Sequence, residues 1–140
     1  MFLTSVRLLI ISAMLLLTSC MTFPHPTPEE LSKADYGGYP DNYGKIVSDY
    51  ASNMLKEPSS ATYTYVKGPT KTWIFQHTYY QYGWGVCYLI SVRNSLEGYM
   101  VHKLYFALIN NGSVIGYELD TITGDPYSPG YAHSLCDRLK

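Results

Sequence analysis

The stretch YMVHKLYFALI-NNGS-VIGYEL, residues 99–119, decides the fold of this chain. Alternate side chains of a β-strand share one face, and alternate positions in residues 99–109 give the mostly apolar set Met100, His102, Leu104, Phe106 and Leu108. The Asn-Gly pair within residues 110–113 is the strongest short-range signal for a hairpin with a type I′ turn. Residues 114–119 are then the returning strand. The stretch therefore predicts two antiparallel strands joined by a tight turn.

Further strand patterns precede this hairpin. Residues 62–66 alternate and are bounded by Pro58 and by Gly68-Pro69. Residues 71–75 either continue that strand after a bend or form a short separate strand. In the next strand, one face is formed by Trp84, Val86, Tyr88, Ile90 and Val92. Together these patterns predict an antiparallel meander of three to four strands.

One amphipathic helix is predicted over residues 41–57, capped by Asp41 or Asn42 and ended by Pro58. Its apolar face, which we expect to pack on the sheet, consists of Tyr43, Ile46, Val47, Tyr50, Met54 and Leu55. The other face of the sheet must be covered by the tail, by curling of the sheet or by a partner. The tail can form a short helix over residues 132–139. The predicted fold class is α+β.

The amino terminus has the features of a secretory signal. Arg7 precedes about ten apolar residues, too few for a bilayer span of roughly 20 residues. Leu17-Thr18-Ser19-Cys20 resembles the lipobox of bacterial lipoproteins. This resemblance implies cleavage after residue 19, a diacylglycerol on Cys20 and acylation of the new amino terminus. An ordinary signal peptide with an incidental cysteine remains the alternative.

Residues 20–40 are predicted to be a lipidated tether ahead of a single domain over residues 41–140. Residues 21–39 of this tether contain three prolines, a Gly37-Gly38 pair and few apolar side chains. We therefore expect it to be extended or disordered and to hold the domain clear of the headgroups. The formal net charge of the whole chain is −1, which offers no electrostatic footprint for nucleic acid. We therefore expect the lipid on Cys20 to anchor the chain to the membrane.

A second resemblance covers residues 35–109. The order of the segments 35–43, 55–69 and 83–105 resembles a group of small secreted proteins and lipoproteins of proteobacteria whose function is uncharacterised. This resemblance implies a small α+β fold in the cell envelope. Met21 rather than Asp after Cys20 implies, by resemblance to known lipoproteins of diderm bacteria, sorting to the outer membrane, where the protein would face the periplasm. The chain departs from the group at residues 88–90 and 100–102, where the group has a more polar stretch and a Gly-rich loop. No catalytic residue is transferred.

Two cysteines remain if Cys20 carries lipid. Cys87 lies in a strand pattern and Cys136 near the carboxyl terminus, and an even number of cysteines in an oxidising compartment favours a disulfide. Such a bond would pin the tail to the sheet. A buried free Cys87 with an idle Cys136 is the alternative.

The sequence offers little for catalysis or metal binding. Its four histidines do not form spaced pairs with another histidine, a cysteine or a carboxylate. It contains neither a Gly-rich phosphate loop before a helix nor a nucleophile elbow. We therefore expect no metal, no cofactor and no enzyme.

An aromatic cluster is the candidate functional feature, and it consists of Trp73, Phe75, Tyr79, Tyr80, Tyr82 and Trp84. Residues 79–82 are predicted to be a solvent-facing connection, so Tyr79, Tyr80 and Tyr82 are candidate partner-binding residues. Alternatively, half of these rings are core and half incidental. The favoured function is docking of a protein partner, such as another subunit of an envelope or secretion complex. The alternative is a periplasmic module that binds glycan or inhibits a hydrolase.

Overall fold

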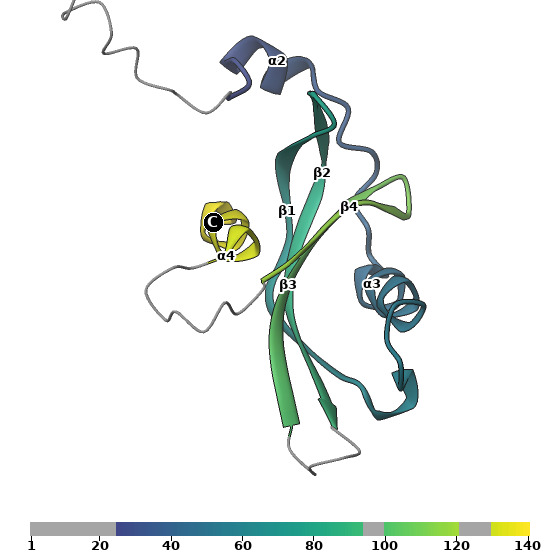
Figure 1. Cartoon of the computed structure of the whole chain (residues 1–140). Coiled ribbons are helices and arrows are strands. Elements are labelled where there is room, and N and C mark those ends of the chain that lie inside the picture. Colours follow the sequence, from purple (N-terminus) through teal and green to yellow (C-terminus); the bar gives the residue numbers. More distant parts are fainter. Residues whose placement is uncertain (1–24, 94–99, 121–129) are drawn as a thin grey trace, which may run out of the picture.

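The computed structural model describes residues 25–93, 100–120 and 130–140 (Figure 1). The four strands form one antiparallel sheet in the order β1-β2-β3-β4. The prediction of an α+β fold with an antiparallel meander is therefore confirmed. The signal over residues 1–19 and the lipid site Cys20 lie outside the described residues. The elements, in chain order, are α2 (Pro28–Lys33), α3 (Tyr43–Ser52), the 3-10 helix η1 (Pro58–Ser60), β1 (Thr62–Gln76), β2 (Tyr79–Arg93), β3 (Met100–Asn110), β4 (Ser113–Leu119) and α4 (Tyr131–Arg138).

Two tight turns join the long strands. Asn111 and Gly112 connect β3 to β4 with φ angles of 48° and 77°, the left-handed pair that a type I′ turn requires. The predicted hairpin is thus confirmed. His77 and Thr78 connect β1 to β2 with φ angles of 52° and 74°. This second turn uses the same backbone geometry without either of the residues that usually signal it.

The patterns at residues 62–66 and 71–75 belong to one strand. The register between β1 and β2 shifts between Tyr65 and Lys67 and again between Lys67 and Thr70. The second of these irregularities spans the Gly68-Pro69 pair, where proline cannot donate to the ladder. Of the two alternatives, continuation after an irregularity is the one observed.

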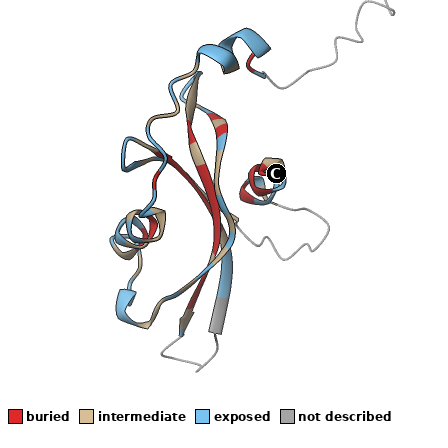
Figure 2. Ribbon diagram, turned by 180° about the vertical axis from the view of Figure 1, so that it is seen from behind, coloured by how far each residue is buried: buried red, intermediate tan, exposed pale blue. Residues whose placement is uncertain are grey.

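Helices α3 and α4 lie on opposite faces of the sheet, as the two views of Figures 1 and 2 show. Consecutive residues of β2 divide between these faces. Val86 and Tyr88 belong to the buried cluster that includes α3, whereas Cys87 belongs to the cluster that includes α4. The tail helix is therefore what covers the second face.

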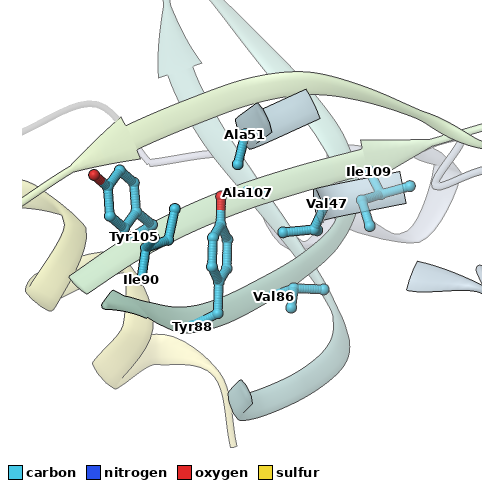
Figure 3. Packing of buried hydrophobic residues seen from close by; sticks show 8 residues of the cluster. All are labelled: Val47, Ala51, Val86, Tyr88, Ile90, Tyr105, Ala107 and Ile109. Atoms are coloured by element: carbon cyan, nitrogen blue, oxygen red, sulfur yellow. The ribbon is translucent and has the colours of Figure 1, made fainter. Parts of the chain in front are cut away.

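The buried cluster under α3 includes Tyr88 and Tyr105 (Figure 3). Four partly buried tyrosines pack against it: Tyr43, Tyr63, Tyr65 and Tyr117. Tyr88 is fully buried at its centre, and its ring is stacked on that of Tyr105 with the centroids 5.6 Å apart. The Tyr88 hydroxyl has no hydrogen-bond partner among the described residues, and burial raises its pKa. The buried members of this cluster are Val47, Ala51, Val86, Tyr88, Ile90, Tyr105, Ala107 and Ile109.

Helix α3 is shorter than predicted and buries fewer side chains. It ends at Ser52 rather than at residue 57, and Val47 and Ala51 are its buried residues. Tyr50 is 36% exposed and Met54 is 46% exposed, so the prediction that both are core is wrong. Val47 and Ala51 are one turn apart and face the sheet together, while Tyr50 lies beside Tyr117 with 5.4 Å between ring centroids.

The expectation of an extended or disordered segment ahead of the domain is wrong for the part that the structure describes. Residues 28–33 form α2, which begins with a capping box: Glu30 N–H donates to the Thr27 hydroxyl, and Thr27 N–H donates to the Glu30 carboxylate. Residues 35–40 then lie against the sheet. Its proline and glycine content predicted flexibility, but in the structure these residues belong to a segment with a defined conformation.

Helix α4 ends the described chain where a short helix was predicted. Cys136 on α4 and Cys87 on β2 lie at disulfide distance, with 5.8 Å between their Cα atoms. The Lys67 ammonium donates to the carbonyls of Cys136 and Leu139, both at 2.9 Å, and so satisfies the carboxyl end of the helix. These contacts fix α4 against β1 and β2.

Candidate functional site

The candidate site lies at the end of the β1–β2 hairpin. Trp73 and Phe75 on β1 are directly opposite Tyr82 and Tyr80 on β2. The Tyr80 ring centroid is 5.2 Å from that of Phe75, 5.5 Å from that of Trp73 and 6.4 Å from that of Tyr82. We call these four rings the hairpin-end cluster. Contacts between opposed and diagonal rings of this kind stabilise paired strands.

The prediction that residues 79–82 form a loop is wrong, because they are paired strand residues at the start of β2. The whole turn is made by His77 and Thr78, and this leaves Tyr79 free to pair with Gln76. Tyr79 is 54% exposed, while Tyr80 and Tyr82 are half-buried. The rings therefore reach the surface from a rigid strand.

A first hollow, the α2 hollow, lies between the hairpin and α2. It has a volume of about 680 Å³ and is lined by Thr27, Glu29, Glu30, Lys33, Ala34, Asp35, Tyr80 and Tyr82. The Lys33 ammonium is paired with the Glu29 carboxylate at 2.6 Å, so the lining has an excess of negative charge. Partial burial, with Glu30 nearby, raises the pKa of Tyr82. The α2 hollow thus combines aromatic rings with carboxylates.

A second hollow, the α4 hollow, lies between the hairpin and α4. It has a volume of about 510 Å³ and is lined by His25, Trp73, Phe75, Tyr131, Ser134, Leu135 and Arg138. The Arg138 guanidinium carbon is 4.2 Å from the Trp73 ring centroid, and the guanidinium donates to the Trp73 carbonyl at 2.7 Å. Burial lowers the pKa of Arg138, which nevertheless stays charged because arginine starts so high.

The segment before α3 buttresses the hairpin from the side of β3. Trp84 Nε1 donates to the Gly37 carbonyl at 3.1 Å, and the Asn110 amide donates to the carbonyls of Asp35 and Tyr82 at 3.0 and 2.9 Å. The ring of Tyr36 meets that of Tyr82 edge to face. These contacts hold the rings of β2 in place.

Gly37 is the residue that permits this close approach. Its φ is +68°, and a Cβ there would lie 2.7 Å from the Asn111 backbone nitrogen. Sequence reasoning treated Gly37 as a flexible element and missed Tyr36 as a neighbour of the candidate tyrosines. The recurrence of Tyr and Gly in residues 35–43 was the sequence feature that could have indicated an ordered segment next to these tyrosines.

No constellation for metal or nucleophilic chemistry is found in the described ranges. Within residues 25–93, 100–120 and 130–140, no three His, Cys, Asp or Glu side chains are grouped as a metal site would require. Ser91 Oγ lies 2.6 Å from His102 Nδ1, but these are directly opposed strand residues whose contact satisfies the largely buried Ser91 hydroxyl. The arrangement at the hairpin end is suited to binding.

Comparison of the chain with protein-family models, with curated proteins and with solved structures finds no match. The resemblance of residues 35–109 to envelope proteins therefore stays a prediction. Among the helices of the described residues, none is both long and apolar enough to cross a membrane.

Proposed function

We propose that this chain is a lipid-anchored, non-enzymatic protein of the bacterial cell envelope that binds a protein partner. Cys20 would carry the lipid. Met21 rather than Asp follows it, which by resemblance to known lipoproteins implies sorting to the outer membrane, facing the periplasm. The partner would be another subunit of an envelope or secretion complex.

The observation that supports partner binding is the presence of large rings at the surface of a rigid element. Tyr79 is exposed, and Tyr80 and Tyr82 line the α2 hollow from the part of β2 that is paired with β1. Tyrosine and tryptophan are enriched among the residues that dominate binding energy in protein interfaces. Rings that are already fixed by neighbours lose little conformational entropy when a partner binds.

The charges of the α2 hollow indicate what the partner presents. Glu30 and Asp35 lie beside Tyr80 and Tyr82, and Lys33 is already paired within α2. A partner segment with an arginine or lysine next to an apolar side chain would match this surface. Arginine fits especially well, because its planar group can stack on a ring and pair with a carboxylate.

Photo-crosslinking in intact cells tests this proposal. A crosslinking amino acid at Tyr79 of the full chain should give one discrete adduct with an envelope protein. The same group at Thr64, which is also exposed but lies toward the other end of β1, serves as the control and should give none. The proposal fails if position 79 gives no adduct, or if both positions give the same adducts.

Glycan binding is the second candidate, favoured by the same α2 hollow. Aromatic faces beside carboxylates, as in Tyr80 and Tyr82 with Glu30 and Asp35, can stack on sugar rings and accept bonds from their hydroxyls. A module that inhibits a cell-wall hydrolase would use the same surface. Retention on purified peptidoglycan, lost when Tyr80 and Tyr82 are replaced, would favour this candidate. An adduct from position 79 that survives glycan digestion would favour the protein partner.

A further inference from the structure

We propose that the α4 hollow is a membrane-docking surface, which seats Trp73, Phe75, Tyr131 and Arg138 in the phospholipid headgroup layer. The inference rests on the proposed lipid at Cys20. It assigns the second hollow of the hairpin end to a lipid surface, leaving the α2 hollow for the partner.

The first argument is the length of chain between the lipid and the hollow. The His25 ring lies edge-on to Trp73 with 5.5 Å between centroids, so the described chain begins at the hollow itself. Four residues lie between Cys20 and His25, so the Cα atoms of these two residues are at most about 18 Å apart even in a fully extended chain. The headgroup layer of one leaflet is itself roughly 5–8 Å thick. An acyl chain on Cys20 would therefore bring the hairpin end to the membrane surface.

The second argument is that residues 25–40 cannot act as a long spacer. Residues 28–33 are coiled into α2, and residues 35–37 are hydrogen-bonded to the side chains of Trp84 and Asn110. The slack that a flexible tether would supply is taken up by these contacts. The distance between lipid and domain is thereby set by residues 20–25.

The third argument is the chemistry of the lining. Phe75 is 36% exposed and Tyr131 is 49% exposed, so both rings present apolar area beside the hollow. Trp73, which contacts both the Arg138 guanidinium and the His25 ring, completes the surface. Aromatic rings with a polar end, and arginines with apolar stems, are the side chains that settle at the boundary between headgroups and acyl chains.

The fourth argument is the charge difference between the two hollows. Among the described residues that line the α4 hollow there is no carboxylate, and Arg138 supplies a positive charge. The α2 hollow is lined by three carboxylates, those of Glu29, Glu30 and Asp35. A phospholipid phosphate can approach Arg138 but would be repelled from the α2 hollow. Of the two hollows, the α4 hollow is the one suited to headgroups.

Docking of this kind would set orientation more than affinity. Several acyl chains hold a protein at the membrane stably, and a few interfacial rings add little to that. The rings would fix the angle of the domain relative to the membrane, because they would contact the membrane at a second point close to the lipid. The hairpin end would face the membrane while the β2–β3 end pointed away.

The test uses the mature lipidated protein in vesicles of phosphatidylethanolamine with a minor share of phosphatidylglycerol. Spin labels attached to the lipid near the headgroup quench tryptophans that lie at that depth. The variant Trp73→Phe leaves only Trp84, so the difference from the wild type reports Trp73. We expect Trp73 to be quenched at least twofold more strongly than Trp84.

A pair of double variants completes the test. Phe75→Ser with Tyr131→Ser should reduce the quenching of Trp73 by half or more. Val66→Ser with Ile115→Ser also removes two exposed apolar side chains, but outside the hollow, and should leave the quenching unchanged. Melting of each variant in detergent verifies that it is folded.

Mass spectrometry of the purified protein separates the two proposals. An absent acyl chain on Cys20 would overturn the anchor and the docking together. An acylated protein whose Trp73 is quenched no more than Trp84 would overturn the docking alone. The docking would also be overturned if Trp73 became shielded from solvent only after other envelope proteins were added, because a protein would then occupy the hollow.

Discussion

Two groups of aromatic rings in this molecule have similar composition and different surroundings. The tyrosines under α3 lie on the central strands and are covered by a helix, and Tyr88 among them is fully buried. The hairpin-end cluster extends from the same sheet, but Phe75 stays 36% exposed and two hollows adjoin it. The coverage of the rings, rather than their number, thus divides the core from the candidate binding surface.

The largest effect is expected from a charge placed under α3. Val47 is fully buried in the cluster, and an unpaired carboxylate there would oppose folding by about 4 kcal/mol or more. Val47→Asp should therefore be unfolded, as judged by far-UV circular dichroism and melting. Asn42→Asp places the same charge at the exposed start of α3, where it should be neutral or slightly stabilising. A folded Val47→Asp would contradict the assignment of this cluster as core.

The next effect concerns the link between α4 and the sheet. Closing the loop between Cys87 and Cys136, which are 49 residues apart, should stabilise the fold by about 4 kcal/mol in the chain-entropy model. Cys87→Ala with Cys136→Ala should lower the melting temperature accordingly, and reductant should lower that of the wild type but not of the variant. Two free thiols in the unreduced, denatured protein would show that the bond does not form.

A matched glycine pair tests how the segment before α3 is held. Gly37→Ala combines a left-handed φ with a close approach to Asn111, so we expect a loss of about 1–3 kcal/mol and release of the segment from Trp84. Gly38→Ala has open space around its new Cβ and should be nearly neutral. The tryptophan emission and proteolysis at Lys33 report the release. Equal behaviour of the two variants would mean that the segment is not held as described.

Removing the hydroxyl of Tyr65 should destabilise the fold, whereas removing that of Tyr88 should not. Tyr88→Phe removes a buried hydroxyl that lacks a partner among the described residues, which should leave stability unchanged or raise it by about 1 kcal/mol. Tyr65→Phe removes a hydroxyl that donates to the Gly44 carbonyl at 2.9 Å and should lower it by about 1 kcal/mol. Denaturant unfolding measures both, and the same sign for both would contradict the contacts.

The raised pKa of Tyr88 adds a dependence on pH to this comparison. An unfolded tyrosine ionises near pH 10, whereas the buried one resists ionisation. The contribution of neutral, buried Tyr88 to stability is therefore complete below about pH 10 and is lost as the pH rises above it, because ionisation then favours the unfolded chain. Tyr88→Phe should therefore lose less stability than the wild type between pH 9 and 11.

The sequence was informative wherever one physical signal acted alone. Alternation located β3 and the Asn-Gly pair located its turn. The even number of cysteines besides Cys20 favoured a bond between Cys87 and Cys136, which the structure places at disulfide distance. Sequence reasoning failed at His77-Thr78, where the turn adopts a left-handed backbone without the Asn-Gly or Asp-Gly pair that usually signals it. Tyr79 was consequently placed in a loop, although its exposure was anticipated.

Long-range packing explains the remaining differences. The prolines of residues 24–28 and the Gly37-Gly38 pair indicate flexibility by composition, yet Trp84 and Asn110 supply hydrogen bonds that no local pattern reveals. Tyr50 and Met54 fit the helical period, but Tyr50 stays partly exposed beside Tyr117 on β4 and Met54 lies beyond the last residue of α3. The candidate site was thus found by its residue types and misjudged in its local structure.

The most direct test of the central claim compares two changes to tyrosine. Tyr80→Ala with Tyr82→Ala should cost about 1–2 kcal/mol of stability, a melting shift of several degrees, because both rings are only half-buried. The crosslinked adduct from position 79 should fall about tenfold, which corresponds to about 1.4 kcal/mol of binding. Tyr88→Ala should instead unfold the protein. The account is contradicted if the double variant unfolds as Tyr88→Ala does, or if it stays folded and keeps the adduct.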